Sequence, residues 1–189
     1  MTKHAIGLIF VIIICVTLSS WTSAHSESAP DREYLIKAAF LYNFARFVNW
    51  PDDAFPDAHS PLSLCIVGKD PFLDALKTIK GKTIRGRKLE ITHLARIENL
   101  EQCHMLFISA SEEHRLPEIL DTLREESILT VSDMSRFALR GGAIHFITVS
   151  SKIRFEINVD ATDTVGLKIS SKLLKLARVV HTGRRQGAH

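Results

Sequence analysis

The hydrophobic and polar residues of this chain follow two patterns, one typical of helices and the other of short buried strands. Between Asp31 and Val48, apolar side chains recur at three- and four-residue spacing, the period of an amphipathic helix. We expect Asp31 to cap this helix and Trp50-Pro51 to end it, because the residue before a proline avoids the α-helical region. Additional aromatic residues widen its apolar arc, so other elements must cover it on more than one side: Phe40, Phe44 and Phe47.

Short apolar runs follow this helix and alternate with further helical segments. The runs predict strands at 62–67, 88–92, 105–108, 128–131, 143–148 and 153–158. Helices are expected at 72–79, 114–123 and 134–139, from Asp160 to the break at Gly166, and at 170–180. This alternation predicts an α/β fold: a single three-layer domain with a mostly parallel sheet, helices on both faces and a late antiparallel hairpin. We expect that hairpin to form an edge of the sheet.

The N-terminal residues have the three parts of a secretory signal peptide. Lys3 and His4 give a positive start, an uncharged run follows at 5–18, and small residues precede a cleavage site after Ala24. The uncharged run has about 14 residues, fewer than the roughly 20 that a membrane-spanning helix needs. We therefore expect a cleaved signal peptide at 1–24, a linker at 25–30, one domain at 31–180 and a basic tail at 181–189.

The charges of the chain are nearly balanced. The formal net charge is +3 for the full chain, and cleavage after Ala24 removes only one charged residue, Lys3. This balance does not favour binding to nucleic acid. Basic residues near the C-terminus are interpreted as a solvated helix face and a loose tail: Lys168, Lys172, Lys175, Arg178, Arg184 and Arg185.

Two cysteines, Cys65 and Cys103, remain after the signal peptide is removed. An even number of cysteines in an oxidising compartment favours a disulfide. Because His104 adjoins Cys103, a metal site is an alternative, although the spacing lacks the C-x-x-C pattern of zinc sites. Two buried free thiols are the third alternative, and the sequence leaves all three open.

The motifs that would indicate catalysis are missing from the sequence. The patterns G-x-G-x-x-G, G-x-S-x-G and H-E-x-x-H do not occur. Gly81-Lys82-Thr83 resembles the end of a phosphate-binding loop, but Leu76 stands where that loop needs its first glycine. We therefore expect neither an enzyme nor a bound cofactor or metal.

Several blocks of sequence, in order, resemble the YfiR family of periplasmic proteins. The resemblance covers about residues 33–180 and rests on KAAFLYNFARFV at 37–48 with Trp50-Pro51, LCIVGKDPF at 64–72, CHMLFIS at 103–109, LTVSD at 129–133, RFEIN at 154–158 and GLKISSKLL at 166–174. It implies an α/β regulator that represses an inner-membrane diguanylate cyclase of the YfiN type by holding its periplasmic sensor domain. An OmpA-like outer-membrane lipoprotein of the YfiB type can sequester such a regulator, after which cyclic di-GMP and biofilm formation rise.

The resemblance also bears on the cysteines and on the interface. The family's named member has two disulfides, whereas this chain keeps only Cys65 and Cys103, which fit one pair. Our candidates for partner binding are Phe146 on the hairpin, Glu156 and Asn158 at its end, and Ile169 after the glycine break. Each of them has a second interpretation as a core residue or a solvated strand residue, and a homodimer stays open.

The alternative hypothesis is a periplasmic module that binds a small ligand and serves an envelope receptor or transport system. In open α/β sheets, ligands collect beyond the carboxyl ends of the strands. Three predicted loops follow strands and would line such a crevice: 68–71, 109–111 and 132–133. Ordinary turn chemistry also explains their Gly, Ser and Asp residues.

Overall fold

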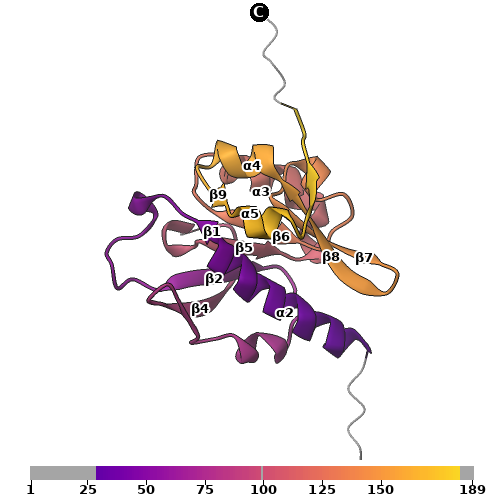
Figure 1. The fold of residues 1–189 in the computed structure, drawn as a ribbon, viewed down its shortest axis with the longest axis horizontal. Helices are drawn as coiled ribbons and strands as arrows, with labels where there is room; N and C mark the ends of the chain where they lie inside the picture. The colour runs from indigo at the N-terminus through magenta and orange to yellow at the C-terminus, as the bar shows by residue number, and fades with distance from the viewer. Residues whose placement is uncertain (1–28, 99, 184–189) are drawn as a thin grey trace, which may run out of the picture.

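Eight strands form one sheet in the computed structural model, which describes residues 29–98 and 100–183 (Figure 1). The strand order is β10-β8-β7-β6-β5-β2-β4-β3, and β1 and β9 form a separate antiparallel pair. The strands are β1 (Val48–Asn49), β2 (Leu62–Val67), β3 (Thr83–Ile84), β4 (Arg87–Leu94), β5 (Met105–Ile108), β6 (Leu129–Ser132), β7 (Ile144–Val149), β8 (Lys152–Asn158), β9 (Lys168–Ile169) and β10 (Arg178–Val180).

The sheet is mostly parallel, as the sequence predicts. Strands β4, β2, β5, β6 and β7 run parallel to one another. Strand β3 is antiparallel to β4, β8 returns antiparallel to β7, and β10 runs parallel to β8. The predicted strands at 62–67 and 105–108 have the observed bounds, and the other four agree to within two residues. The predicted α/β class with a late hairpin is therefore confirmed.

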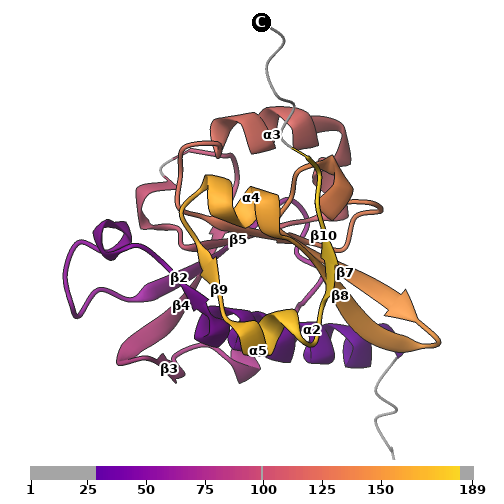
Figure 2. The same ribbon diagram turned by 45° about the horizontal axis from the view of Figure 1, so that its top comes forward.

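Helices cover the sheet on both faces (Figure 2). Helix α2 (Ala29–Phe47) and the short α5 (Ser171–Leu174) lie on one face, and α3 (Leu116–Thr122) lies on the other. Alternate residues of β2 show this arrangement directly. Leu64 and Ile66 pack in the cluster that includes α2, whereas Cys65 and Val67 pack in the cluster that includes α3. All six residues of β2 are buried because both faces of the strand are covered.

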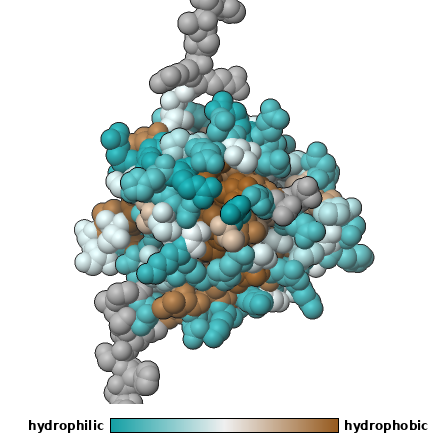
Figure 3. Space-filling model, turned by 180° about the vertical axis from the view of Figure 1, so that it is seen from behind, coloured by the Kyte–Doolittle hydropathy of each residue, from teal (hydrophilic) through white to brown (hydrophobic). Residues whose placement is uncertain are grey.

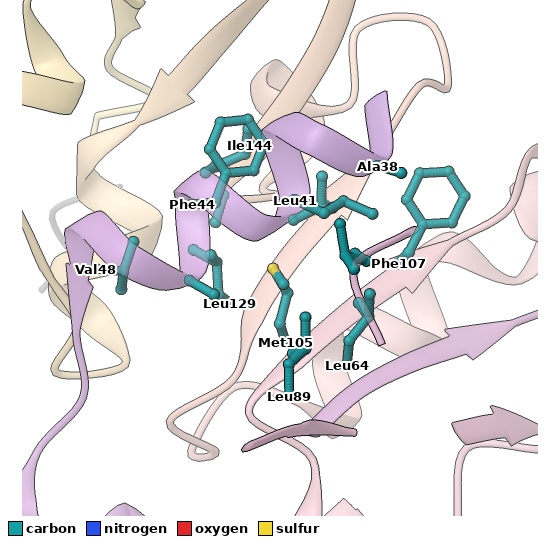
Figure 4. Close-up of a cluster of buried hydrophobic side chains, with 14 of the residues drawn as sticks. Ala38, Leu41, Phe44, Val48, Leu64, Leu89, Met105, Phe107, Leu129 and Ile144 are labelled. Atoms are coloured by element: carbon teal, nitrogen blue, oxygen red, sulfur yellow. The ribbon is translucent and has the colours of Figure 1, made fainter. Parts of the chain in front are cut away.

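The larger core lies between α2 and the sheet (Figure 4). Leu41 and Phe44 of α2 are fully buried and point toward residues of the central strands. These strand residues are likewise almost inaccessible to solvent: Leu64, Leu89, Met105, Phe107, Leu129 and Ile144. The aromatic residues of α2 therefore have the cover that their wide apolar arc requires.

Several predicted helices are shorter or tighter than expected. The segment predicted at 72–79 contains only the 3-10 helix η2 (Ala75–Thr78), and that at 134–139 contributes only to η5 (Ala138–Arg140). The segment predicted at 114–123 divides between η4 (Ala110–Arg115) and α3. Runs this short have few intrahelical bonds to offset the cost of nucleating an α-helix. Helix α4 (Val159–Thr164) forms where predicted, and two further 3-10 turns are η1 (Asp52–Ala54) and η3 (Leu100–Gln102).

Two predictions about the ends of elements are wrong. Asp31 does not cap the first helix, since it lies within the first turn of α2. The helix predicted at 170–180 ends at Leu174, and the chain then forms β10 alongside β8. Val179 and Val180 are β-branched and pair with the free side of β8, so this pairing prevails over the helical pattern. Consequently β10, rather than the β7–β8 hairpin, forms that edge of the sheet.

The surface of the described chain is largely hydrophilic. Figure 3 shows apolar residues gathered at the centre of one face and hydrophilic residues over most of the remainder. Large apolar side chains that are exposed occur on separate elements: Ile36, Leu73, Leu139, Val149, Leu176 and Val179. Within residues 29–98 and 100–183, no helix is both long and apolar enough to cross a membrane. The predicted signal peptide at 1–24 and the first four residues of the predicted linker at 25–30 lie outside the described residues. The last two residues of that linker, Ala29 and Pro30, begin α2.

Candidate functional site

The β7–β8 hairpin extends beyond the rest of the sheet (Figures 1 and 2). Strand β7 pairs with β6 only at Ile144 and His145, and β8 pairs with β10 only at its last three residues, 156–158. The turn at the tip consists of Ser150 and Ser151, both with positive φ (48° and 59°), as in tight two-residue hairpin turns. Residues 146–155, here called the distal hairpin, therefore have neighbours in the ladder only within the hairpin.

A buried ammonium group fastens α2 to the end of β6. The Lys37 side chain is 4 % exposed, and its Nζ lies 2.6 Å from Asp133 Oδ2 and 2.6 Å from Glu33 Oε1. Burial alone would lower the pKa of Lys37, but hydrogen bonds to Asp133 and Glu33 outweigh it and raise that pKa. Lys37 therefore stays charged, and its pairing with two carboxylates offsets the cost of burying the charge.

Tyr34 completes this group of side chains. Its hydroxyl donates a hydrogen bond to Asp133 Oδ2 at 2.9 Å. Burial and the neighbouring negative charge of Asp133 raise the pKa of Tyr34 to about 12, so the phenol stays protonated. Tyr34, Glu33 and Lys37 belong to α2, whereas Asp133 follows β6. These contacts fix the position of the first turns of α2 above the carboxyl end of β6.

An open hollow of about 460 Å³ lies between this group and the distal hairpin. Its walls combine α2, the segment after β6 and β7: Glu33, Tyr34, Lys37, Asp133, Ser135, His145, Phe146, Ile147 and Thr148. The hollow is at the carboxyl end of β6, where α/β sheets commonly bind their ligands. It is therefore the candidate functional site of the described chain.

A second polar group holds the C-terminal segment against β8. Glu156 is 3 % exposed, and its carboxylate contacts His145 Nδ1 at 2.8 Å and the guanidinium of Arg178. Asn158, fully buried, donates from Nδ2 to Ala138 O at 2.8 Å and to Thr182 Oγ1 at 3.2 Å. Alternate residues of β8 thus hold Arg178 of β10 and Thr182, two residues beyond the end of that strand.

The four residues predicted to bind a partner all make contacts within the domain itself. Phe146 is 3 % exposed, with ring centroids 6.1 Å from Phe40 and 5.5 Å from Phe44. Glu156 and Asn158 hold the C-terminal segment, and Ile169 pairs with Val48 in the β1–β9 ladder. Phe146 alone of the four lines the hollow. A role for these residues in partner binding stays a prediction, and the structure shows that each one contacts other elements of its own chain.

Sequence reasoning missed the contact between Lys37 and Asp133. A signal was present, because Glu33 and Lys37 are four residues apart on the helix, the spacing of an ion pair. Lys37 also adjoins the apolar stripe of α2, where an unpaired lysine would not be expected. The sequence offered no sign of the partner at Asp133, which is 96 residues away.

A disulfide joins Cys65 of β2 to Cys103, just before β5, with 6.0 Å between their Cα atoms. Both thiols that a metal site would need are thus consumed. His104 is also engaged, since its Nδ1 accepts from Ser63 N–H at 3.1 Å and its Nε2 contacts Ala54 O at 3.0 Å. Burial lowers the pKa of His104, which keeps this neutral form. Of the three alternatives for the cysteines, the structure therefore shows the disulfide.

The crevice expected for a small ligand is partly closed. The loops after β2 and β5 contact each other, with Lys69 N–H donating to Ser111 Oγ at 2.9 Å. A Cβ atom placed on Gly68, which has φ of 85°, would lie 2.4 Å from Ser111 Oγ and 2.8 Å from Glu112 Cγ. Side chains therefore fill the space between these two loops. The third expected loop, at 132–133, contributes Asp133 to the hollow beside β7 instead.

These observations define a disulfide-linked α/β domain whose buried polar side chains join its own elements, with an open hollow beside a projecting hairpin. Residues 34–178, about three quarters of the chain, match the model of the family described as YfiR/HmsC-like. The chain belongs to the YfiR/HmsC-like family. This family is regulatory, and membership indicates a regulator of diguanylate cyclase signalling, in agreement with the resemblance found in the sequence blocks.

Proposed function

We propose that this protein is a periplasmic regulator that binds the periplasmic sensor domain of an inner-membrane diguanylate cyclase and represses the enzyme, lowering cyclic di-GMP. The observation that carries the proposal is the family match over residues 34–178. Two independent features support it. The disulfide between Cys65 and Cys103 suits an oxidising compartment, and residues 1–24 have the pattern of a secretory signal.

The mechanism that follows is stoichiometric binding. The regulator represses the cyclase only if it binds the inactive arrangement of the sensor domain more tightly than the active one. The difference in binding free energy then shifts the cyclase population toward the inactive state across the membrane. An OmpA-like outer-membrane lipoprotein that sequesters the regulator relieves repression by lowering its free concentration.

The domain is suited to this task because a disulfide and buried ion pairs hold its elements together. The disulfide ties β2 to the start of β5, the Lys37 group ties α2 to β6, and Glu156 ties β10 to β8. A surface on strands and helices that are already held in place loses less conformational entropy on binding than a mobile surface does. A preorganised surface of this kind is an advantage for a repressor that must hold a partner in one conformation.

The first test is recovery of the partner from the cell envelope. The protein with an affinity tag is expressed in its own periplasm, cross-linked briefly and purified, and the proteins that accompany it are identified by mass spectrometry. We expect enrichment of an inner-membrane diguanylate cyclase over a control in which the same tag is carried by an unrelated exported protein. Recovery of a transport receptor without any cyclase would contradict the proposal.

A small-ligand module is the second candidate function. The specific observation in its favour is the open hollow of about 460 Å³ with both charged and apolar walls. Side chains fill the space between the loops after β2 and β5, which argues against the ligand crevice that the sequence predicts there. A ligand that tunes repression from the hollow would reconcile the two functions.

A further inference from the structure

One edge of β7 is left open because β6 stops early. At the end of β6, the Ser132 hydroxyl donates to Ile108 O at 2.7 Å and accepts from Met134 N–H at 3.0 Å. Asp133 then turns toward Lys37 on α2. The chain therefore leaves the ladder after Ser132, whose register partner on β7 is His145. Residues 146–149 continue beyond this point without a strand on that side.

The direction of the backbone groups along β7 follows from the ladder with β8. Asn158 N–H donates to Ala143 O at 2.8 Å across the hairpin. Hydrogen-bonded pairs alternate along an antiparallel ladder, so Ile147 and Val149 direct their N–H and C=O groups toward β8, as Ala143 does. Thr148, between them, directs its N–H and C=O groups away from β8, toward the open edge. An open edge of this kind is a template for another strand.

The hollow beside this edge has a negative excess of charge. The carboxylates of Glu33 and Asp133 line it together with a single ammonium, that of Lys37. Asp133 already accepts from Tyr34 and Lys37, whereas the Glu33 side chain is 39 % exposed and has an oxygen accessible to an incoming group. A strand that enters the hollow with a lysine or arginine would place opposite charges together.

We propose that the open edge of β7 binds an extended segment of a partner protein as an added strand, with a basic side chain of that segment directed toward Glu33. Main-chain hydrogen bonds to Thr148 supply affinity, and the charge of the hollow supplies selectivity. The other edge of the hairpin, formed by β8, is a poorer site for a basic segment. Its exposed cations, Lys152 and Arg154, would repel a lysine or arginine of that segment.

A second copy of the chain fits this edge less well than a partner does. If two copies paired through β7, each would present Phe146, Ile147, Thr148 and Val149 to the other. None of these residues carries the positive charge that complements Glu33. The charge of the hollow therefore favours a different protein over a homodimer at this edge.

The test uses a random peptide library displayed on phage, selected on the mature chain. We expect enrichment of peptides with alternating apolar residues and a lysine or arginine. The substitution Thr148→Pro removes an N–H that is not bonded within the hairpin, and proline is tolerated at such edge positions. An enriched peptide should bind this variant about tenfold more weakly, the loss expected for one hydrogen bond. The control Thr148→Val keeps the N–H and should bind like the wild type.

Two further measurements keep the outcome decisive. Thermal melts show whether Thr148→Pro is folded, and hydrogen exchange on the wild type shows whether peptide binding protects the Thr148 amide. Glu33→Gln should weaken peptides that contain a basic residue and spare those that lack one. The proposal is overturned if no peptide is enriched, if the proline variant binds as well as the valine variant, or if the Thr148 amide stays unprotected. Since the library contains no cyclase sequence, the result is independent of the proposed function.

Discussion

Replacing Phe146 with alanine is expected to lower the free energy of unfolding by about 3–5 kcal/mol. The ring is 3 % exposed and packs against Phe40 and Phe44, which belong to α2. Its removal leaves a cavity between the helix and the hairpin that rigid neighbours cannot fill completely. Because domains are typically stable by only about 5–15 kcal/mol, this is a large part of the total. Unfolding in urea, followed by circular dichroism, measures the loss.

The Phe146→Ala variant also shows whether Phe146 acts as a core residue or contacts the partner directly. If Phe146 supports the hairpin, partner binding should fall in step with the fraction of folded protein and recover under stabilising conditions. Val149→Ala is the matched control, since Val149 lies on the same strand, is 49 % exposed and should cost no more than about 0.5 kcal/mol. A Phe146→Ala protein with unchanged stability and no partner binding would show that Phe146 contacts the partner directly.

Removing the disulfide is expected to lower the free energy of unfolding by about 4 kcal/mol, from the chain entropy of the loop that it closes. The bond joins residues separated by 38 positions, and both cysteines are buried in the core beside α3. In the unfolded chain the bond excludes many extended conformations, so its loss favours unfolding. The measurement compares the wild type with the variant that carries both Cys65→Ala and Cys103→Ala.

A reducing agent provides the control for this prediction. Dithiothreitol should destabilise the wild type and leave the double alanine variant unchanged, because the variant has no disulfide to reduce. Equal stability of oxidised wild type and double variant would contradict the stabilising role of the bond. The family's named member has two disulfides, whereas this chain keeps the cysteines for only one. The distal hairpin of this chain has no cysteine. Any thiol–disulfide response of the described domain therefore depends on Cys65 and Cys103.

The parts of the fold that could be predicted from sequence were those with a strong local pattern. Strands β2 and β5 are apolar throughout and buried on both faces, so composition and length alone gave their bounds. The helical period of α2 was equally clear over several turns. The C-terminal segment was different, because its apolar spacing suited a helix while its neighbour β8 had an unpaired side. The segment instead pairs with β8 as β10, with Arg178 beside the buried Glu156, and these contacts join residues 22 positions apart.

The candidate site was harder to predict for the same physical reason. The hollow is formed by α2, the residues after β6 and the distal hairpin, which are far apart along the chain. A single sequence reveals which residues are polar, but it does not show that Lys37 meets Asp133. Three of the residues predicted to bind a partner lie on the hairpin: Phe146, Glu156 and Asn158. Their burial shows that the same residue types also serve to attach a helix and a terminal strand.

The central claim is that this protein represses a diguanylate cyclase, and the cellular level of cyclic di-GMP tests it most directly. The measurement compares the parent strain, a strain that lacks the gene, and the deleted strain expressing the wild-type chain. We expect cyclic di-GMP to rise on deletion and to return to the parent level when the chain is supplied. Cyclic di-GMP that stays at the parent level after deletion, in every growth condition examined, would contradict the claim.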